Sequence, residues 1–416
     1  MNNLSANNQT IDLLCDVIDN FGDIGFVYRL AKSLSKEIQN STETRLRISV
    51  KGINSFAKMC PFVDNSKSCQ TIKNNQTNNL EWEILNWEDQ EACLLSYRKI
   101  PPQKILQCFQ CTRPDFFDQI IFSRTALSSV IINIDYLTAE EWARDFHLKK
   151  GVTPVQQSRK INFMPGFMEG TGGLIFTEHW QNNLTLQKLF PKVEFSTDFK
   201  IFIFGYEKDY TPLLKSISRF SKISGRKCTI FAADRKNNFE QAVKSAPNVQ
   251  ICQMEFVTQE QFDSLLTEFD FLFIRGEDSW ARASLLGTPF LWQAYKQEEQ
   301  YQLIKVDAFV KLLTNGIETE QAKILENAFF SYNTTFCNRF QDLEEFGTDS
   351  DTVLYSKKFL PLFHQPEELK KFEEDSILNL LLNIEKIQPA YKRLSEKLHS
   401  LGNLTNKIVE ILNKIR

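Results

Sequence analysis

The sequence lacks the glycine-rich motifs that bind nucleotide phosphates in many α/β enzymes. Neither G-x-G-x-x-G nor G-x-x-x-x-G-K-[ST] occurs, which argues against a dinucleotide-dependent dehydrogenase and against a P-loop NTPase. Histidine is scarce, with only 4 scattered residues, and no second cysteine pair or spaced histidine pair accompanies Cys108 and Cys111. A structural zinc site needs four ligands at set spacings, so we predict no metal site.

Net charge and long apolar runs are lacking as well. The 49 basic residues nearly balance the 52 acidic ones, so the whole chain has no general attraction to nucleic acid or anionic lipid. No apolar run approaches the roughly 20 residues that span a bilayer. The nine cysteines are an odd number, and the polar start from Met1 to Ser5 lacks a signal-peptide core. We expect a reduced, cytoplasmic protein with no nucleic-acid or membrane partner.

What the chain does have is length and regular alternation. Its 416 residues, 42% of them hydrophobic, fit two α/β domains of about 150–200 residues each. Strand-like runs in the second half (199–204, 227–232, 249–256, 271–274, 290–292) alternate with helix-like stretches (210–221, 237–245, 259–269, 280–286). The first half has similar runs at 13–18, 46–50 and 130–134, a helix-like stretch at 26–38 and a polar surface loop at 64–79. This spacing predicts βαβ units and parallel sheets.

We therefore predict an α/β fold of two doubly wound, Rossmann-like domains with a ligand cleft at the carboxyl ends of their strands. The first domain spans 1–185 and the second 198–365, with a linker at 181–197. The segment 366–416 carries apolar residues at helical spacing, including Ile377, Leu381 and Ile408. We expect this segment to be helical and its last helix to pack back across the lobes.

The first candidate site lies where the run 13–18 opens into Asp19-Asn20-Phe21-Gly22-Asp23-Ile24-Gly25. The two glycines favour a tight strand-to-helix turn. Asp19 and Asp23, four residues apart, are well placed for proton transfer if both lie on a loop at the end of a central strand. In the alternative, one carboxylate caps the helix and the other is solvated. Both interpretations stay open on the sequence alone.

The second candidate site, Arg275-Gly276-Glu277-Asp278-Ser279-Trp280, follows the apolar run 271–274. A cation beside a helix start, with Arg282 about one turn further on, suits an anion such as a diphosphate. The plainer alternative is an exposed ion pair with Ser279 as the helix cap.

Two further motifs carry less information. Four of the 15 glycines fall within residues 166–173, which indicates a compact backbone in either a simple loop or a ligand loop. Asp349-Ser350-Asp351 has the D-x-D pattern of metal-dependent sugar transferases, but its polar surroundings favour a solvated loop.

Several blocks, in order along most of the chain, match one family. They are residues 19–25, 135–142, 163–167 with Gly172-Gly173, 204–207, 256–259 and 275–279. Together they resemble the EarP family, the bacterial protein-arginine rhamnosyltransferases that modify translation elongation factor P. The resemblance implies a GT-B fold of two facing Rossmann-like domains. It also implies an inverting, metal-independent transfer of L-rhamnose from dTDP-β-L-rhamnose to an arginine, with no cofactor.

The resemblance also implies roles for individual residues. Asp23 would be the general base, Asp19 its neighbour that orients the acceptor, and Glu277 a further catalytic carboxylate. Donor binding would fall to Phe204, Tyr206, Phe256, Gln259, Arg275, Asp278 and Ser279. The sequence departs from the family pattern at Gly205, where Cys is usual, at Thr258 and Lys296, where Pro is usual, and at Gln302, where His is usual.

Chemistry supports the need for carboxylates. An arginine guanidinium has a pKa above about 12 and is a poor nucleophile, so attack on a sugar carbon needs a carboxylate that binds it and takes a proton.

Two other functions are compatible with the sequence: a GT-B transferase with another nucleotide sugar or acceptor, and a non-catalytic nucleotide-sugar-binding module.

Overall fold

The computed structural model describes residues 9–17, 20–38, 44–176, 184–233, 237–297, 301–334 and 366–414. The chain divides into two compact units. One comprises Met1–Phe176 and Leu401–Arg416, and the other comprises Thr177–Ser400. The predicted Asp349-Ser350-Asp351 loop and Asp19 lie outside the described residues.

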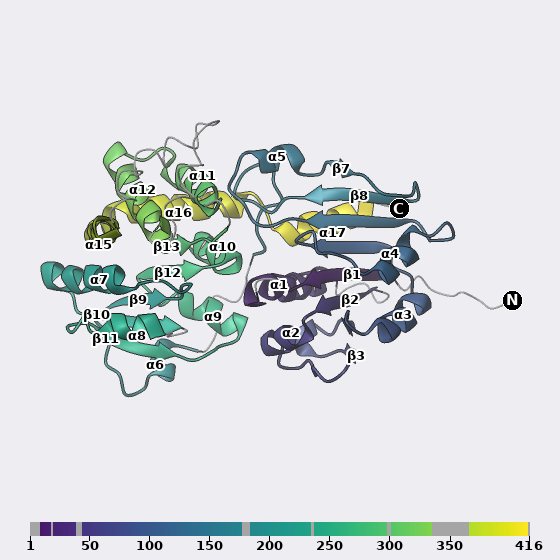
Figure 1. The fold of residues 1–416 in the computed structure, drawn as a ribbon, viewed down its shortest axis with the longest axis horizontal. Helices are drawn as coiled ribbons and strands as arrows, with labels where there is room; N and C mark the ends of the chain where they lie inside the picture. The colour runs from purple at the N-terminus through teal and green to yellow at the C-terminus, as the bar shows by residue number, and fades with distance from the viewer. Residues whose placement is uncertain are drawn as a thin grey trace. The chain divides into compact units, whose positions relative to one another are not determined.

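The first unit is built on an eight-stranded sheet with the order β3-β4-β2-β1-β5-β6-β8-β7 (Figure 1). The six inner strands are parallel, and the edge strands β3 and β7 pair antiparallel. The strands are β1 Gln9–Asp16, β2 Thr44–Lys51, β3 Cys69–Ile72, β4 Trp82–Asn86, β5 Lys104–Cys108, β6 Ser129–Ile134, β7 Lys150–Gly151 and β8 Ser158–Phe163. The predicted parallel sheet is confirmed.

Helices cover both faces of this sheet. They are α1 Asn20–Ile38, α2 Ile53–Met59, α3 Gln90–Lys99, α4 Asp115–Phe122 and α5 Trp142–Phe146, with a 3₁₀ turn at Asn75–Thr77. Successive side chains of β1 point to opposite faces of the sheet, as they do along any strand. Leu13 packs in a core with α1 and α2, whereas Leu14 packs in a second core with α3 and α4. Burial on both faces explains the continuous apolar stretches in inner strands such as β6, although β1 and β2 also carry the buried charges of Asp12 and Arg47.

The second unit has a five-stranded, fully parallel sheet with the order β11-β10-β9-β12-β13. Its strands are β9 Phe199–Ile203, β10 Cys228–Ala233, β11 Gln250–Met254, β12 Phe271–Arg275 and β13 Phe290–Gln293. Its helices before the last segment are α6 Leu186–Leu189, α7 Thr211–Ser224, α8 Asn237–Val243, α9 Gln259–Leu266, α10 Glu277–Leu286, α11 Gln302–Thr314 and α12 Thr319–Thr334. The strand-helix alternation predicted for this half is confirmed element by element.

The last segment is helical, as predicted: α15 Pro366–Leu382, α16 Ile384–Ser400 and α17 Leu404–Lys414. In the second unit, Tyr391 and Ser395 of α16 donate hydrogen bonds to the carbonyls of Phe290 (2.6 Å) and Leu285 (2.5 Å). Helix α17 belongs to the first unit, where Leu404, Ile408 and Leu412 join the core beside α1. The final helices are therefore divided between the two units.

Four local predictions differ from the structure. The polar segment 64–79 is not only a loop, because it contains the edge strand β3, which uses the free edge of β4. Helix α1 begins at Asn20, so Gly22 and Gly25 lie in helical turns and not in a tight turn. Helix α10 begins at Glu277, with acidic residues in its first turn, where they interact favourably with the helix dipole. The segment 181–197 also contains the short helix α6.

A buried ion pair stabilises the first sheet. Arg47 of β2 donates from Nε to Asp12 Oδ1 of β1 at 2.6 Å, and both side chains are fully buried. Burial raises the pKa of Asp12 despite the opposing effect of Arg47. Replacing Arg47 with Met leaves a buried carboxylate without its cation, so we expect a loss of about 3–5 kcal/mol in unfolding free energy. Denaturant unfolding measures this, and a loss below about 1 kcal/mol would contradict the assigned pairing.

His147 predicts a pH dependence of stability. Its Nδ1 accepts a hydrogen bond from the backbone N–H of Met164 (3.1 Å). Burial, aided by the charge of Lys407, lowers its pKa from 6.5 to about 4. The unfolded chain therefore binds more protons between these values, so stability should be fully present above pH 6.5 and fall as the pH drops towards 4. In His147→Asn, which keeps an acceptor that does not titrate, the unfolding midpoint should depend less on pH over this interval.

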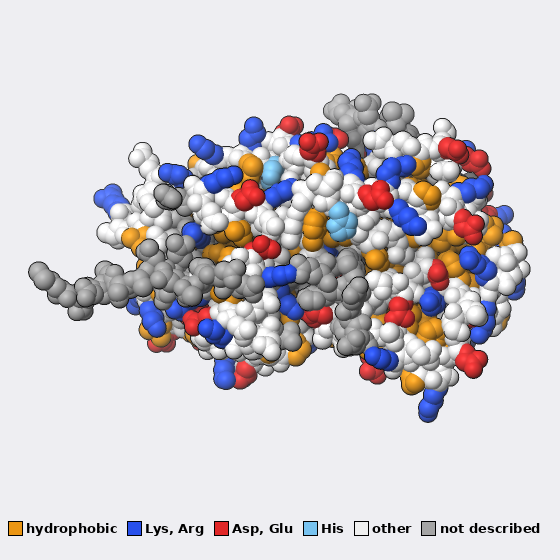
Figure 2. Space-filling view, turned by 180° about the vertical axis from the view of Figure 1, so that it is seen from behind, with side chains coloured by type: hydrophobic (Ala, Val, Ile, Leu, Met, Phe, Trp, Pro, Cys, Tyr) orange, Lys and Arg blue, Asp and Glu red, His pale blue; other side chains and the backbone are white. Residues whose placement is uncertain are grey.

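Acidic and basic side chains are interspersed over the face shown in Figure 2, in keeping with the balanced composition. Within the ranges that the structure describes, no helix is both long enough and apolar enough to cross a membrane.

Candidate functional site

The second unit carries its candidate residues at the point where the strand order of its sheet reverses. Strands β9 and β12 are neighbours in the sheet, although three helices and two strands separate them in sequence. The residues 204–206 follow β9 and the residues 276–279 follow β12, so both segments leave the same carboxyl edge. Ligands of doubly wound sheets bind outside this switch point.

Arg275, the last residue of β12, lies against two aromatic rings from the segment after β9. Its guanidinium carbon is 4.4 Å from the ring centroid of Phe204 and 4.8 Å from that of Tyr206. Both separations are within the range of cation–π attraction, and planar guanidinium groups stack well on aromatic faces. The family resemblance implies a donor-binding role for all three residues, and the structure brings them together.

The segment 204–206 is held closely by its neighbours. Gln293 Oε1 accepts from the backbone N–H of Tyr206 (2.7 Å), and the hydroxyl of Tyr210 donates to the carbonyl of Tyr206 (2.7 Å). A Cβ at Gly205 would lie 2.7 Å from that same Gln293 oxygen and would also collide with the Tyr210 hydroxyl. This crowding gives a physical reason for glycine at a position where the family pattern usually has cysteine.

The turn before α10 is fixed by a glycine and a tryptophan. Gly276 has φ 71° and ψ 169°, which an L side chain rarely adopts. Its carbonyl accepts a hydrogen bond from Trp292 Nε1 at 3.2 Å, and the Trp292 ring stacks on Trp280 at 3.7 Å. Ser279 is a buried residue in the first turn of α10, so it is not the helix cap that the plainer interpretation assumed.

The acidic residues of this turn have cationic neighbours. Glu277 Oε1 lies 3.5 Å from Nζ of Lys305 in α11. Asp278 Oδ1 lies 3.8 Å from Nε of Arg282, which is only 1% exposed. Arg282 is therefore buried in the second unit, with the carboxylate of Asp278 beside its guanidinium.

Phe256 and Gln259 lie at the junction between β11 and α9, on the same carboxyl edge of the sheet, where β10 separates β11 from β9. The Phe256 ring is 65% exposed, whereas Gln259 is buried at the start of α9. Thr258 caps α9 in a reciprocal pair with Gln261, in which Thr258 N–H donates to Gln261 Oε1 (2.9 Å). Thr258, where the family pattern usually has Pro, therefore acts as the cap of α9.

Gln302, where the family pattern usually has His, also has a structural contact, because its Oε1 accepts a hydrogen bond from the backbone N–H of Gln297 (3.0 Å).

In the first unit, Asp23 projects from the first turn of α1 and is only 3% exposed. Burial is the main reason why the pKa of the Cys15 and Cys108 thiols is raised. The negative charge of Asp23 is a smaller cause, which indicates that Asp23 lies near both thiols. These cysteines lie at the carboxyl ends of β1 and β5, the strands between which the order of the first sheet reverses. Asp23 therefore lies on a helix start at the switch point, not on a loop as the proton-transfer interpretation assumed.

An aromatic group that sequence reasoning missed lies at the same edge. Phe26, one turn after Asp23, packs edge-on against Phe109 at 5.2 Å, and Phe109 stacks on Tyr136 at 4.6 Å. Gln110 donates to Asp135 Oδ2 at 2.7 Å. Phe109 and Gln110 both have positive φ (57° and 50°), a cost that often marks functional segments. The sequence signal that could have identified this group is Phe109, an aromatic residue directly after the strand β5.

The other sequence motifs have structural explanations. Burial raises the pKa of the Cys111 thiol to about 12, and Cys111 Sγ contacts the carbonyl of Leu14 (3.5 Å). A Cβ at Gly172 would meet the ring of Phe163, so the glycine-rich run is a compact loop. Among the residues that the structure describes, no group of His, Cys, Asp and Glu side chains could hold a metal ion.

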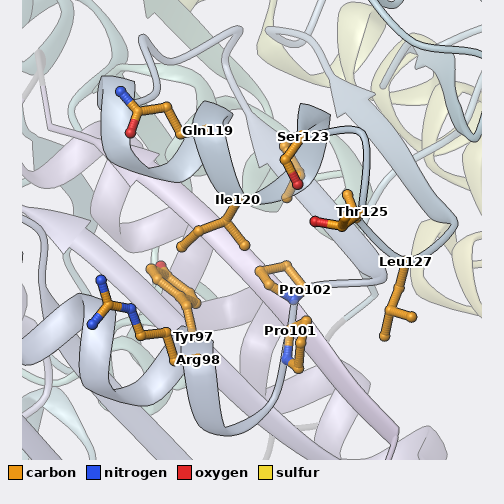
Figure 3. Close-up of a pocket in the computed structure, with 11 residues that line it drawn as sticks. Tyr97, Arg98, Pro101, Pro102, Gln119, Ile120, Ser123, Thr125 and Leu127 are labelled. Atoms are coloured by element: carbon orange, nitrogen blue, oxygen red, sulfur yellow. The ribbon is translucent and has the colours of Figure 1, made fainter.

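A separate cavity of about 320 Å³ lies in the first unit between α3 and α4 (Figure 3). Its lining includes Pro101 and Pro102, just before β5, and Leu127, just before β6. It is therefore at the amino edge of the sheet, the edge opposite to that of Asp23, and it contains none of the predicted site residues. We assign it no role in the candidate site.

Two Rossmann-like units, each with candidate residues at the switch point of its sheet, place this chain among proteins of the GT-B fold. The solved structure of spinosyn rhamnosyltransferase SpnG has this fold, with a TM-score of 0.52 at 11% identity over 97% of this chain and 100% of that one.

The family model for the elongation factor P (EF-P) rhamnosyltransferase EarP matches residues 11–413. The chain belongs to the EarP family, and the resemblance seen in the sequence is confirmed.

Curated relatives are similar over most of the chain. The protein-arginine rhamnosyltransferase of Shewanella oneidensis is 28% identical over 361 residues, which are 79% of this chain and 87% of that protein. The protein-arginine rhamnosyltransferase of Pseudomonas aeruginosa is 28% identical over 347 residues, 77% of this chain and 86% of that protein.

Proposed function

We propose that this protein transfers L-rhamnose from dTDP-β-L-rhamnose to one arginine side chain of elongation factor P, with inversion at the anomeric carbon. Family membership supports the reaction class. The observation that carries the donor site is the stacking of Arg275 on Phe204 and Tyr206 at the switch point of the second sheet. The second unit binds the donor, and the first unit, which carries Asp23, receives the protein acceptor.

The donor would be held by aromatic faces and by positive charge. Phe256, exposed at the same carboxyl edge as Tyr206, offers a ring to the thymine, and Gln259, Asp278 and Ser279 offer polar groups to ribose and diphosphate. As the glycosidic bond breaks, negative charge grows on the departing dTDP. Arg275 and the N–H groups at the start of α10 stabilise that charge without a metal or a further cofactor.

Asp23 is the proposed general base. Its carboxylate binds the planar guanidinium of the acceptor and takes a proton as the new C–N bond forms. Asp19 orients the acceptor, and Glu277 supports the reaction as a further carboxylate. Because a single displacement forms no covalent sugar intermediate, the rhamnosyl arginine has the inverted, α configuration.

Intact-protein mass spectrometry tests the proposal. Incubation of the protein with dTDP-β-L-rhamnose and EF-P should add one deoxyhexose to EF-P, and peptide mapping should place it on one arginine. UDP-sugars in place of the donor, and a small arginine peptide in place of EF-P, test the two rival GT-B specificities. An unmodified EF-P with a protein that binds dTDP would favour the non-catalytic binding module.

A further inference from the structure

A second buried ion pair of the chain involves the segment that follows β9 and carries Phe204 and Tyr206. Lys208 Nζ is 2.5 Å from Glu373 Oε1 of α15, and both side chains are 0% exposed. Lys208 also donates to the carbonyl of Tyr332 in α12 (3.2 Å) and lies 4.2 Å from the centre of that ring. A single lysine from the segment between β9 and α7 is thus tied to two helices that are distant in sequence.

Lys208 is two residues from Tyr206, whose ring contacts Arg275. The backbone of Tyr206 is fixed on both sides, by Gln293 at its N–H and by Tyr210 at its carbonyl. Lys208 lies between Tyr206 and Tyr210, so it anchors the middle of the same seven-residue segment, 204–210. Loss of this anchor would free the segment that presents both donor-binding rings.

The charges on α15 match those of the segment in alternating order. Asp209, next to Lys208, pairs with Lys370 at 3.1 Å, one turn before Glu373 on the same face of α15. Asp209 also accepts from the backbone N–H of Thr211 at the start of α7 (2.9 Å). Two neighbouring residues of the segment are therefore paired with residues of opposite charge that lie one turn apart on α15.

The end of β13 is held by the same part of α12 that contacts Lys208. Asn333, next to Tyr332, accepts from the backbone N–H of Ala294 and donates to the carbonyl of Trp292, both at 2.9 Å. Gln293, which accepts from Tyr206, lies between these two residues. The last turn of α12 thus supports the donor segment by two routes, through Lys208 and through Gln293.

We propose that Lys208 and Glu373 are a positioning pair for the nucleotide diphosphate site: they hold the segment 204–210 so that Phe204, Tyr206 and Arg275 keep their stacked arrangement. This inference rests on the proposed function. A buried ion pair is weak evidence for stability, because well-packed apolar residues in its place are often as stable. Its location behind the donor segment therefore favours a role in fixing geometry.

The test compares three variants by calorimetric binding of thymidine diphosphate, which needs no acceptor. Lys208→Met leaves a buried carboxylate without its cation and can lose stability. The double variant Lys208→Met/Glu373→Met removes both charges, so its melting temperature should stay close to that of the unmodified protein. Arg219→Met is the matched control, because Arg219 joins α7 to Glu374 and Asp375 of the same helix α15 but lies away from the donor segment.

We expect the double variant to bind thymidine diphosphate roughly 10-fold more weakly, which corresponds to about 1.4 kcal/mol of binding free energy. Its KM for the donor should rise, while its KM for EF-P stays unchanged. Arg219→Met should keep the original Kd. A folded double variant with unchanged Kd and donor KM would overturn the positioning role. If the unmodified protein itself does not bind thymidine diphosphate, the proposed function fails, and this inference fails with it.

Discussion

Asp23→Asn is expected to lower kcat by roughly 10²–10⁴-fold, the range for loss of a general base. The substitution keeps the shape of the side chain but removes the negative charge that binds the guanidinium and accepts its proton. Donor binding should not change, since the donor residues belong to the other unit of the chain. Single-turnover transfer to EF-P, followed by intact-protein mass spectrometry, measures the chemical step directly.

Asp16→Asn provides the matched control for this prediction. Asp16 ends the strand that leads to α1 and pairs at 3.0 Å with Lys51, whose side chain is 58% exposed, so loss of this surface ion pair should change neither kcat nor folding appreciably. Transfer by Asp23→Asn at more than about a tenth of the original rate would rule out Asp23 as the base, because even the weakest general-base effects exceed that factor.

Arg275→Met is expected to have the second large effect. Removal of a preorganised positive group at the site of developing charge typically costs about 10²–10³-fold in kcat. The aromatic rings of Phe204 and Tyr206 also lose the cation stacked on them, so the affinity for thymidine diphosphate should fall. Steady-state rates of rhamnose transfer at saturating donor give kcat, and calorimetry gives the Kd for thymidine diphosphate.

Two further variants separate charge from shape. Arg275→Lys keeps the charge but loses the planar stacking surface, so it should fall between the original protein and Arg275→Met. Arg226→Met removes an exposed arginine that lies 5.2 Å from the ring of Phe199, at the opposite edge of the same sheet. It should leave kcat and Kd unchanged. Equal activity of Arg275→Met and Arg226→Met would refute a role for Arg275 in the donor site.

The sequence predicted the second unit well because its strands are buried on both faces. The run 271–274 is continuously apolar and the run 199–204 is interrupted only by Lys200, and such runs between helix-like stretches indicate inner parallel strands. The switch point then follows from strand order, which places the segments after β9 and β12 together. Arg275, directly after an apolar run, was therefore visible as a candidate from the sequence alone.

The helix starts were less predictable, because local turn signals were overridden. Gly22 and Gly25 suggested a turn, yet they lie within α1, whose buried face from Ile24 through Val27 to Ala31 packs on the sheet. Tertiary burial of an amphipathic face outweighs the low helix propensity of two glycines. This difference moves Asp23 from a loop to a helix.

The supporting contacts of the donor site could not be predicted from the sequence. Gln293, Lys208 and Glu373 gain their roles only from pairings between residues that are 85 or more positions apart in the chain, such as the 2.7 Å bond from Tyr206 to Gln293. Periodicity and motif spacing carry no information on such pairs. The donor residues themselves came from the family resemblance, and their catalytic and binding roles stay predictions.

The most direct test of the central claim is the mass and linkage of EF-P after incubation with the protein and dTDP-β-L-rhamnose. EF-P should gain one deoxyhexose on a single arginine, with NMR showing the α anomer, and should gain none with Asp23→Asn. An EF-P of unchanged mass in the presence of folded, donor-binding protein, or a rhamnosyl arginine that retains the β configuration, would contradict that claim.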